Sequence, residues 1–213
     1  MQLLCRIVNS SIGKKVMVAA AGLLLCGFLI THLAGNLFLL VGATAFNHYA
    51  ETLEKNPLLP IAEIGLFALF LLHIVTSLIL RVQDKQARPI AYDHKQSKGG
   101  STWGSSTMAI SGSLILIFLI VHIKTFKFGD QSDGIFHLVV SSFKNPLYAG
   151  FYVLAMAGLG LHLSHGFQSA FRTFGLSHPK YMCLVKKIGW GFALLISAGF
   201  AMLPIWAFFK GNP

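Results

Sequence analysis

Four histidines lie one in each of the first four long apolar segments of the chain: His32, His73, His122 and His162. An ionisable side chain inside a membrane is costly and is by default a functional candidate. Imidazole at that depth can hydrogen-bond between helices, relay protons or bind a metal. Proton relays usually add Asp or Glu, and neither lies deep in these segments. Four histidines on four successive segments therefore favour two pairs of axial metal ligands.

Paired imidazoles are the ligands of a six-coordinate haem. Two axial histidines fill both open positions of the iron, which favours electron transfer over oxygen binding. The three cysteines, Cys5, Cys26 and Cys183, form neither a CxxCH haem-attachment motif nor a set of Fe–S ligands. We therefore expect two non-covalent b haems in this chain, and any Fe–S cluster on a partner.

Composition indicates an integral membrane protein. Hydrophobic residues make up 54% of the 213 residues and charged residues 11%, against about 25% charged in soluble domains. Runs of about twenty apolar residues predict transmembrane helices. The predicted fold is all-α and forms one domain, 1–213, with five transmembrane helices, of which the first four form a bundle around the two haems. The predicted helices span roughly 16–41, 61–81, 107–126, 146–168 and 188–209.

Charge predicts the orientation of these helices. The segment before the first helix and the loops 81–106 and 169–187 carry 12 of the 17 Lys and Arg residues, and these three segments hold the whole net charge of +10. The positive-inside rule then predicts a cytoplasmic N-terminus and an outer C-terminus in the bacterial inner membrane. Lipid headgroups and orientation explain the basic balance. Nucleic-acid binding is not expected, because no soluble domain could carry a basic patch.

Helix direction and depth predict which histidines pair. With a rise of about 1.5 Å per residue, His32 and His122 both lie about 21 Å from the inner boundary. His73 and His162, on helices that run inward, lie about 18 and 22 Å from the outer boundary. Two levels result, roughly 10 Å apart in a core of about 30 Å. His32 pairs with His122 towards the outside, and His73 pairs with His162 towards the inside.

A macrocycle also needs room between helices. Small residues share a helix face with three of the ligands and could provide that room; they are Gly35, Ser77, Gly158 and Gly166. Small residues are equally typical of ordinary helix packing in membranes.

Five histidines remain. His165 lies one turn beyond His162 on the same face and could replace it as ligand; we expect instead a polar neighbour of a haem propionate or of a quinone headgroup. The others, His48, His94, His137 and His178, are expected in loops as solvated or interfacial side chains.

Several motifs resemble one family over nearly the whole chain, the five-helix dihaem cytochrome b anchors of succinate dehydrogenases and fumarate reductases. The strongest is the block Leu159-Gly-Leu-His-Leu-Ser-His-Gly-Phe-Gln-Ser-Ala-Phe-Arg-Thr-Phe-Gly175. The others are Ser11-Ile-Gly-Lys-Lys, His32-Leu-Ala-Gly-Asn-Leu, Phe46-Asn-His-Tyr-Ala, Ala87-Arg-Pro-Ile-Ala-Tyr92, and Gly112 with His122. Each motif alone is weak, whereas their order and spacing together are specific.

The resemblance implies that His73 and His162 hold a proximal haem and that His32 and His122 hold a distal haem. In relatives the residue three positions after the fourth ligand is not a ligand, which supports His162 over His165. The implied partners are a flavoprotein subunit with FAD and an iron–sulphur subunit on the cytoplasmic side, and a membrane quinone. Basic residues of the inner face would suit docking of these subunits and pairing with propionates; they are Arg6, Arg88, Arg172, Lys186 and Lys187.

The place of the quinone stays open at this stage. Glu63 is the one acid at a helix entrance and is a candidate for proton exchange at an outer site; a carboxylate favoured there by the helix dipole is the alternative. An inner site near His165, Gln168 and Arg172 competes with it. Menaquinone is expected over ubiquinone.

Two other functions also stay open. One is the dihaem anchor of another quinone-linked enzyme, of the formate dehydrogenase, hydrogenase or b561 type, although these lack the block at 162–175. The other is a haem-free structural anchor in which the histidines serve as packing groups.

Overall fold

The computed structural model describes residues 10–87 and 103–212, and these two ranges form helices without strands. The five long helices are α2 (Ser11–Asn36), α4 (Leu59–Gln86), α5 (Trp103–Phe126), α7 (Pro146–Thr173) and α8 (Pro179–Phe209). Each of the five is long and apolar enough to cross a membrane. The prediction of an all-α, multi-pass membrane protein is therefore confirmed. Arg6, Arg88, His94 and most of the motif 87–92 lie outside the described residues.

The long helices extend beyond the predicted apolar segments. α4 continues to Gln86 instead of ending at 81, α7 reaches Thr173 instead of 168, and α8 begins at Pro179 instead of 188. The added turns carry polar residues such as Lys186 and Lys187, which a count of apolar residues excludes. Lys and Arg are good helix formers whose charged ends can reach water from the membrane boundary, so the helices outlast the apolar runs.

Side-chain caps mark the starts of three long helices. Ser10 Oγ accepts a hydrogen bond of 2.9 Å from the backbone N–H of Gly13 at the start of α2. Asn145 Oδ1 caps α7 in the same way, and His178 Nδ1 caps α8. Pro146 and Pro179 follow these two caps, where a missing N–H costs nothing. The polar side chain before each apolar run thus sets where the helix begins.

Two short helices, α3 (Ala43–Glu54) and α6 (Ile135–Phe143), were not predicted. They pack against each other, and Asn47 Oδ1 joins them by accepting a hydrogen bond of 2.9 Å from the backbone N–H of Phe136. Neither has the twenty apolar residues that the search for transmembrane helices required. His48 lies in α3 and His137 in α6, so their predicted placement in loops was wrong.

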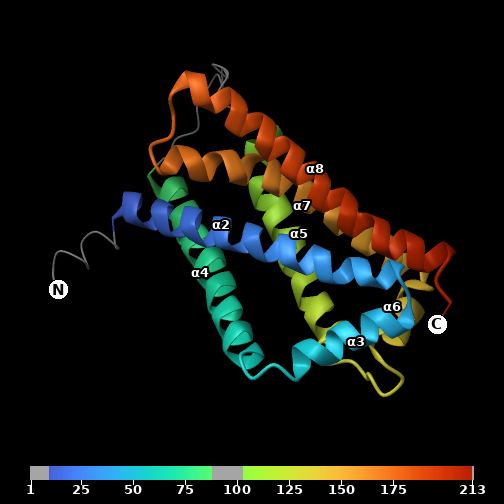
Figure 1. The fold of residues 1–213 in the computed structure, drawn as a ribbon. Coiled ribbons are helices and arrows are strands. Elements are labelled where there is room, and N and C mark those ends of the chain that lie inside the picture. Colours follow the sequence, from blue (N-terminus) through green and yellow to red (C-terminus); the bar gives the residue numbers. More distant parts are fainter. Residues whose placement is uncertain (1–9, 88–102, 213) are drawn as a thin grey trace.

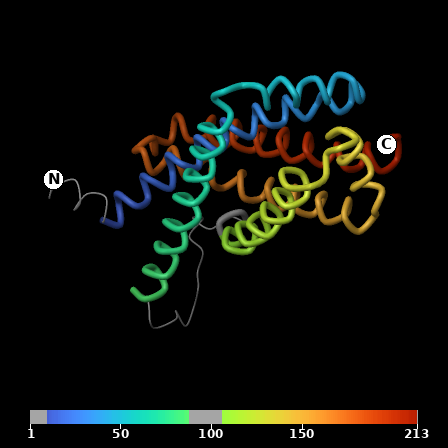
Figure 2. Tube along the Cα trace, turned by 90° about the horizontal axis from the view of Figure 1, so that it is seen from below, coloured from blue at the N-terminus to red at the C-terminus, as the bar shows by residue number. Residues whose placement is uncertain are grey.

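The two ends of the molecule are distinct (Figures 1 and 2). α2 begins at one end, whereas α3, α6 and the end of α8 lie at the other, which we call the C-terminal end. An odd number of membrane crossings requires the ends of the chain to separate in this way. A 3₁₀ turn, η1 (Leu37–Leu40), leads from α2 into α3 at the C-terminal end.

Helix α7 is the centre of the packing. It contacts α8 along its length and also packs against α5 and α2. Its side chains Tyr152 and Ala155 belong to the two buried clusters, which α8 and α2 complete with residues such as Ile196 and Leu33. α4 packs mainly against α2 and crosses it at the edge of the molecule (Figures 1 and 2). Only Thr76 of α4 is buried.

The closest approach of α7 and α8 predicts a stability effect at Gly160. A Cβ atom at Gly160 would lie 3.1 Å from Ser197 Cβ of α8, whereas a Cβ atom at Gly150 would meet nothing within 4 Å. Replacing Gly160 by Val should overpack the contact and lower the free energy of unfolding by about 1–3 kcal/mol. Thermal unfolding of the purified protein in detergent measures this. The matched control Gly150→Val should unfold like the native protein, and equal losses in both variants would contradict the packing described.

Candidate functional site: two histidine pairs

The structure brings the four membrane histidines together as two pairs. The ring centroids of His32 on α2 and His122 on α5 lie 5.9 Å apart, with perpendicular ring planes. Those of His73 on α4 and His162 on α7 lie 6.4 Å apart at an interplanar angle of 69°. These are the same two pairs that helix direction and depth predict from the sequence. The two histidines of each pair are far apart in the sequence and come from two different helices.

Both separations suit one metal ion held between two imidazoles. Metal–imidazole nitrogen bonds of about 2 Å place the two ring centroids about 6 Å apart. The described residues include no group of three or more His, Cys, Asp and Glu side chains that could hold a metal ion. The chain thus offers two imidazoles per site, and this donor set fits haem iron, whose remaining ligands come from the macrocycle.

Hydrogen bonds to Nδ1 orient the rings of the His73–His162 pair. His73 Nδ1 lies 3.2 Å from the carbonyl oxygen of Val18, which can only accept, so the proton is on Nδ1. His162 Nδ1 lies 3.3 Å from Ser111 Oγ, whose own hydrogen can be donated to the carbonyl oxygen of Thr107 at 3.0 Å. Ser111 Oγ can then accept from His162 Nδ1. With the proton on Nδ1, each ring keeps a lone pair on Nε2, the nitrogen that a metal would take.

The His32–His122 pair is held differently. His122 Nδ1 lies 3.4 Å from the hydroxyl of Tyr152 on α7. His32 has only the amide of Asn36 on its own helix, which donates to the carbonyl oxygen of His32 at 2.8 Å and reaches Nδ1 at 3.5 Å. A contact of 3.5 Å is at the limit of a hydrogen bond. The Tyr152 contact, at 3.4 Å, is also long, but its hydroxyl oxygen can accept from Nδ1–H, which the amide nitrogen of Asn36 cannot do.

The four Nε2 atoms have no hydrogen bond and are not completely buried. Every hydrogen bond of these rings within the described part of the chain falls on Nδ1. Across the same residues, no fully buried side-chain nitrogen or oxygen lacks a partner. Each Nε2 therefore keeps some accessible surface, and an unpaired nitrogen of this kind is what a metal would bind.

Aromatic rings enclose the His32–His122 pair. Phe28 stacks on His32 at 5.0 Å between centroids, and Phe118 stacks on His122 at 5.4 Å. Phe126 and Phe200 complete the surround, one against each histidine. An apolar wall of this kind excludes water and suits a flat aromatic ligand.

Two glycines on neighbouring helices make space for the other pair. A Cβ atom at Gly22 of α2 would lie 3.2 Å from Cε1 of His73, and one at Gly112 of α5 would lie 3.6 Å from Cε1 of His162. Sequence reasoning sought small residues on the ligands' own helices and missed Gly22; it named Gly112 only within a motif. Their role depends on where two helices cross, and the residue pattern of one helix does not show where another helix crosses it.

The small residues predicted to make room have other neighbours. A Cβ atom at Gly35 would meet the phenol ring of Tyr49 from α3, and one at Gly158 would lie 2.7 Å from Leu114 of α5. A Cβ atom at Gly166 would meet nothing within 4 Å. Ser77 Oγ donates a hydrogen bond of 2.6 Å to the carbonyl oxygen of His73. Gly35 and Gly158 thus serve close helix contacts, and Ser77 bonds to the backbone of its own helix.

The residues predicted for an inner quinone site follow one another along the last turns of α7. His165 is half-buried, Gln168 is buried, and Arg172 is exposed at the end of the helix. Gln168 Nε2 donates a hydrogen bond of 2.8 Å to the carbonyl oxygen of Ser164, so its amide serves the helix itself. His165 follows His162 by one turn, but His162 is the ring that lies against His73.

Glu63 lies in the first turns of α4 and forms an ion pair with Lys127, which follows α5. Both side chains are about half exposed, at 42% and 52% of their surface. The pair joins the end of α5 to the start of α4. Glu63 is thus a carboxylate at the surface with a cation beside it, and not an acid buried among apolar side chains.

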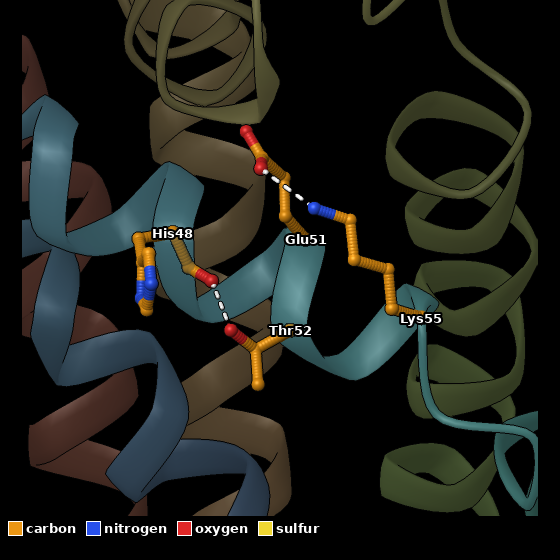
Figure 3. Close-up of polar contacts among 4 residues, drawn as sticks. All are labelled: His48, Glu51, Thr52 and Lys55. Atoms are coloured by element: carbon orange, nitrogen blue, oxygen red, sulfur yellow. Dashed lines mark hydrogen bonds and ion pairs between the residues drawn. The ribbon is translucent and has the colours of Figure 1, made fainter.

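Helix α3 carries a separate set of polar contacts (Figure 3). Lys55 and Glu51 form an exposed ion pair at 3.5 Å, and Thr52 Oγ1 donates a hydrogen bond of 2.7 Å to the carbonyl oxygen of His48. The imidazole of His48 points away from the ion pair in Figure 3. His48 takes part in neither histidine pair, which makes it a control for the ligand variants below.

Comparison with protein-family models, curated proteins and solved structures gave no match. The interpretation of the site therefore depends on the geometry described above and on the motifs of the sequence.

The contact between Gly22 and His73 predicts a selective effect on one pair. A Val side chain at position 22 should displace the His73 ring, so that the His73–His162 pair loses the b haem expected there while the other pair keeps its own. Haem content per chain, measured from the reduced b-type absorbance, should fall from about two haems to about one. Gly27→Val on the same helix, where a Cβ atom meets nothing within 4 Å, should keep both haems. Equal loss in both variants would refute a specific contact.

Proposed function

We propose that the chain is the dihaem cytochrome b membrane anchor of a succinate:quinone oxidoreductase, either a succinate dehydrogenase or a fumarate reductase. In this proposal His32 and His122 bind one haem b, and His73 and His162 bind the other. The observation that carries it is the presence of two imidazole pairs at metal-bridging separation, with Nε2 available in all four rings. The order and spacing of the sequence motifs are the reason for proposing a succinate dehydrogenase or fumarate reductase and not another quinone-linked enzyme.

A bound haem b supplies one reversible electron at a potential that its axial ligands and their hydrogen bonds tune. The chain's own residues supply the rest. In this proposal the carbonyl oxygen of Val18 and the hydroxyl oxygen of Ser111 accept from Nδ1–H of His73 and His162 and leave Nε2 for the iron. Phe28 and Phe118 shield His32 and His122 from water.

The proposed partners follow from the direction of electron flow. A cytoplasmic flavoprotein subunit with FAD and an iron–sulphur subunit would exchange electrons with the His73–His162 haem, and a membrane quinone, menaquinone in our expectation, would exchange them with the chain. Exposed cations at the ends of α7 and α8 opposite the C-terminal end, Arg172, Lys186 and Lys187, would contact the soluble subunits. The host membrane in this proposal is the bacterial cytoplasmic membrane, with the N-terminus inside.

We place quinone chemistry at the C-terminal end, near Glu63. Its carboxylate lies at the molecular surface near the start of α4, with the ammonium group of Lys127 next to it. The competing location for the quinone is on the inner side, near His165, Gln168 and Arg172 in the last turns of α7. The two locations differ in which haem is nearer, so variants separate them.

Ligand replacement tests the haem proposal directly. His32→Ala and His122→Ala should each remove the same b-type spectral component, and His73→Ala and His162→Ala should each remove the other, because each haem needs both imidazoles. Reduced-minus-oxidised spectra with a redox titration of the purified complex measure the components. His48→Ala and His165→Ala should keep both haems.

Three results would contradict this proposal in different ways. Native protein without b-type bands would make the chain a haem-free anchor. Loss of the same component in His32→Ala and His73→Ala would overturn the pairing. Two haems with co-purifying formate dehydrogenase or hydrogenase subunits, in place of a flavoprotein with FAD, would support another quinone-linked enzyme.

Replacing Glu63 tests the position of the quinone chemistry. Glu63→Gln should lower quinone-linked turnover at least tenfold, as expected on loss of a group that transfers protons, while both haems stay bound. Lys127→Gln removes the ion pair but keeps the carboxylate, and it should lower turnover less. Unchanged turnover in Glu63→Gln with both haems in place would move the site elsewhere, and the same measurement on Arg172→Gln would then examine the opposite end of α7.

A further inference from the structure

Tyr152 occupies a special position beside the His32–His122 pair. It is 5% exposed and lies among Phe118, Phe126 and Phe143, whose ring centroids are 4.9–6.0 Å from its own. Its hydroxyl lies 3.4 Å from His122 Nδ1 and 2.9 Å from the hydroxyl of Tyr148, one turn earlier on α7. A buried phenol in apolar surroundings needs such partners.

The hydroxyl of Tyr152 joins these contacts into a hydrogen-bonded path from His122 to Tyr148. When His122 carries a metal on Nε2, its Nδ1 carries the proton and donates to Tyr152 Oη. The hydrogen of Tyr152 is then free to be donated to Tyr148 Oη. Each donation polarises the next, so Tyr148 strengthens the acceptor that His122 meets.

This hydrogen-bonded path ends near the molecular surface. Tyr148 is the third residue of α7 and lines an open groove of about 360 Å³ between α5 and α7. Ile117 and Val121 line the α5 side of this groove. The hydrogen-bonded path therefore runs from Tyr148, in the first turn of α7, to His122, one turn before the end of α5.

We propose that Tyr152, backed by Tyr148, is a positioning residue that sets the electronic state of His122 and thereby the redox potential of the haem on the His32–His122 pair. This inference rests on the proposed function. Of the two rings in this pair, His122 has an Nδ1 partner that can accept a hydrogen bond, the hydroxyl oxygen of Tyr152, whereas the amide nitrogen of Asn36 next to His32 Nδ1 can only donate. Control of this haem through its axial ligands therefore passes mainly through Tyr152.

The sign of the effect follows from the hydrogen bond. An Nδ1–H group that donates to an acceptor makes the imidazole a stronger electron donor, which stabilises oxidised iron and lowers the potential. Removing the acceptor in Tyr152→Phe should raise the midpoint potential of this haem. Tyr148→Phe keeps the direct contact and removes only its support, so it should raise the potential by a smaller amount.

A redox titration of the purified complex tests the inference. The two components are first assigned with the ligand variants, and then Tyr152→Phe, Tyr148→Phe and Tyr181→Phe are compared with the native protein. We expect an upward shift of the His32–His122 component alone, larger in Tyr152→Phe than in Tyr148→Phe. Tyr181, in the first turn of α8 and exposed, should give no shift.

The outcomes separate this inference from the proposed function. Two b haems in the native protein, with an unshifted His32–His122 component in Tyr152→Phe, would overturn the role of Tyr152 and leave the haem proposal intact. Equal shifts of both components would likewise overturn it, since they report a general structural change. Should Tyr152→Phe fail to bind haem, Tyr148→Phe decides: an upward shift supports the chain, and an unchanged potential overturns it.

Discussion

The need of each membrane histidine for partners at both ring nitrogens is the constraint on which the site depends. Imidazole in an apolar interior loses its hydrogen bonds to water, and a ring nitrogen without a partner there is costly. The chain meets half of this need through Nδ1, from a carbonyl group, a serine, a tyrosine and, more weakly, an amide. Nε2 has no hydrogen-bond partner in any of the four rings among the described residues. Two imidazoles without a hydrogen bond on Nε2 at metal-bridging separation are what we propose as one haem site, and the structure contains two such pairs.

Helix packing makes these pairs possible through small residues at crossings. Gly22 and Gly112 let the rings of His73 and His162 lie against neighbouring helices, and Gly160 lets α8 approach α7. α7 is central because it contacts α2, α5 and α8 and also carries His162 and Tyr152. Each pair draws one ring from a helix that packs loosely, α4 or α5, in which little of the membrane-spanning stretch is buried by protein. A ligand between the rings would add the contacts that these helices lack.

The two pairs differ in how they are held, and this difference bears on function. His73 is oriented by the carbonyl oxygen of Val18, which can only accept, and His162 by the hydroxyl of Ser111, which can accept while it donates to Thr107. His122 instead meets Tyr152, whose hydroxyl continues to Tyr148 near the surface. One proposed haem is thus enclosed by fixed backbone and serine contacts. The other is connected through two phenols to the end of the molecule where we place quinone chemistry.

The sequence by itself determined the five membrane helices and the pairing of histidines, because apolar length, loop charge and helix rise are properties of single segments. It missed α3 and α6, whose apolar runs are too short to be recognised, and it ended α4 and α7 too early because charged turns remain helical. Gly22 and Tyr152 could not be recognised from their own helices. Their roles arise where one helix meets another, at His73 and at His122, and only the tertiary structure decides which side chains meet there.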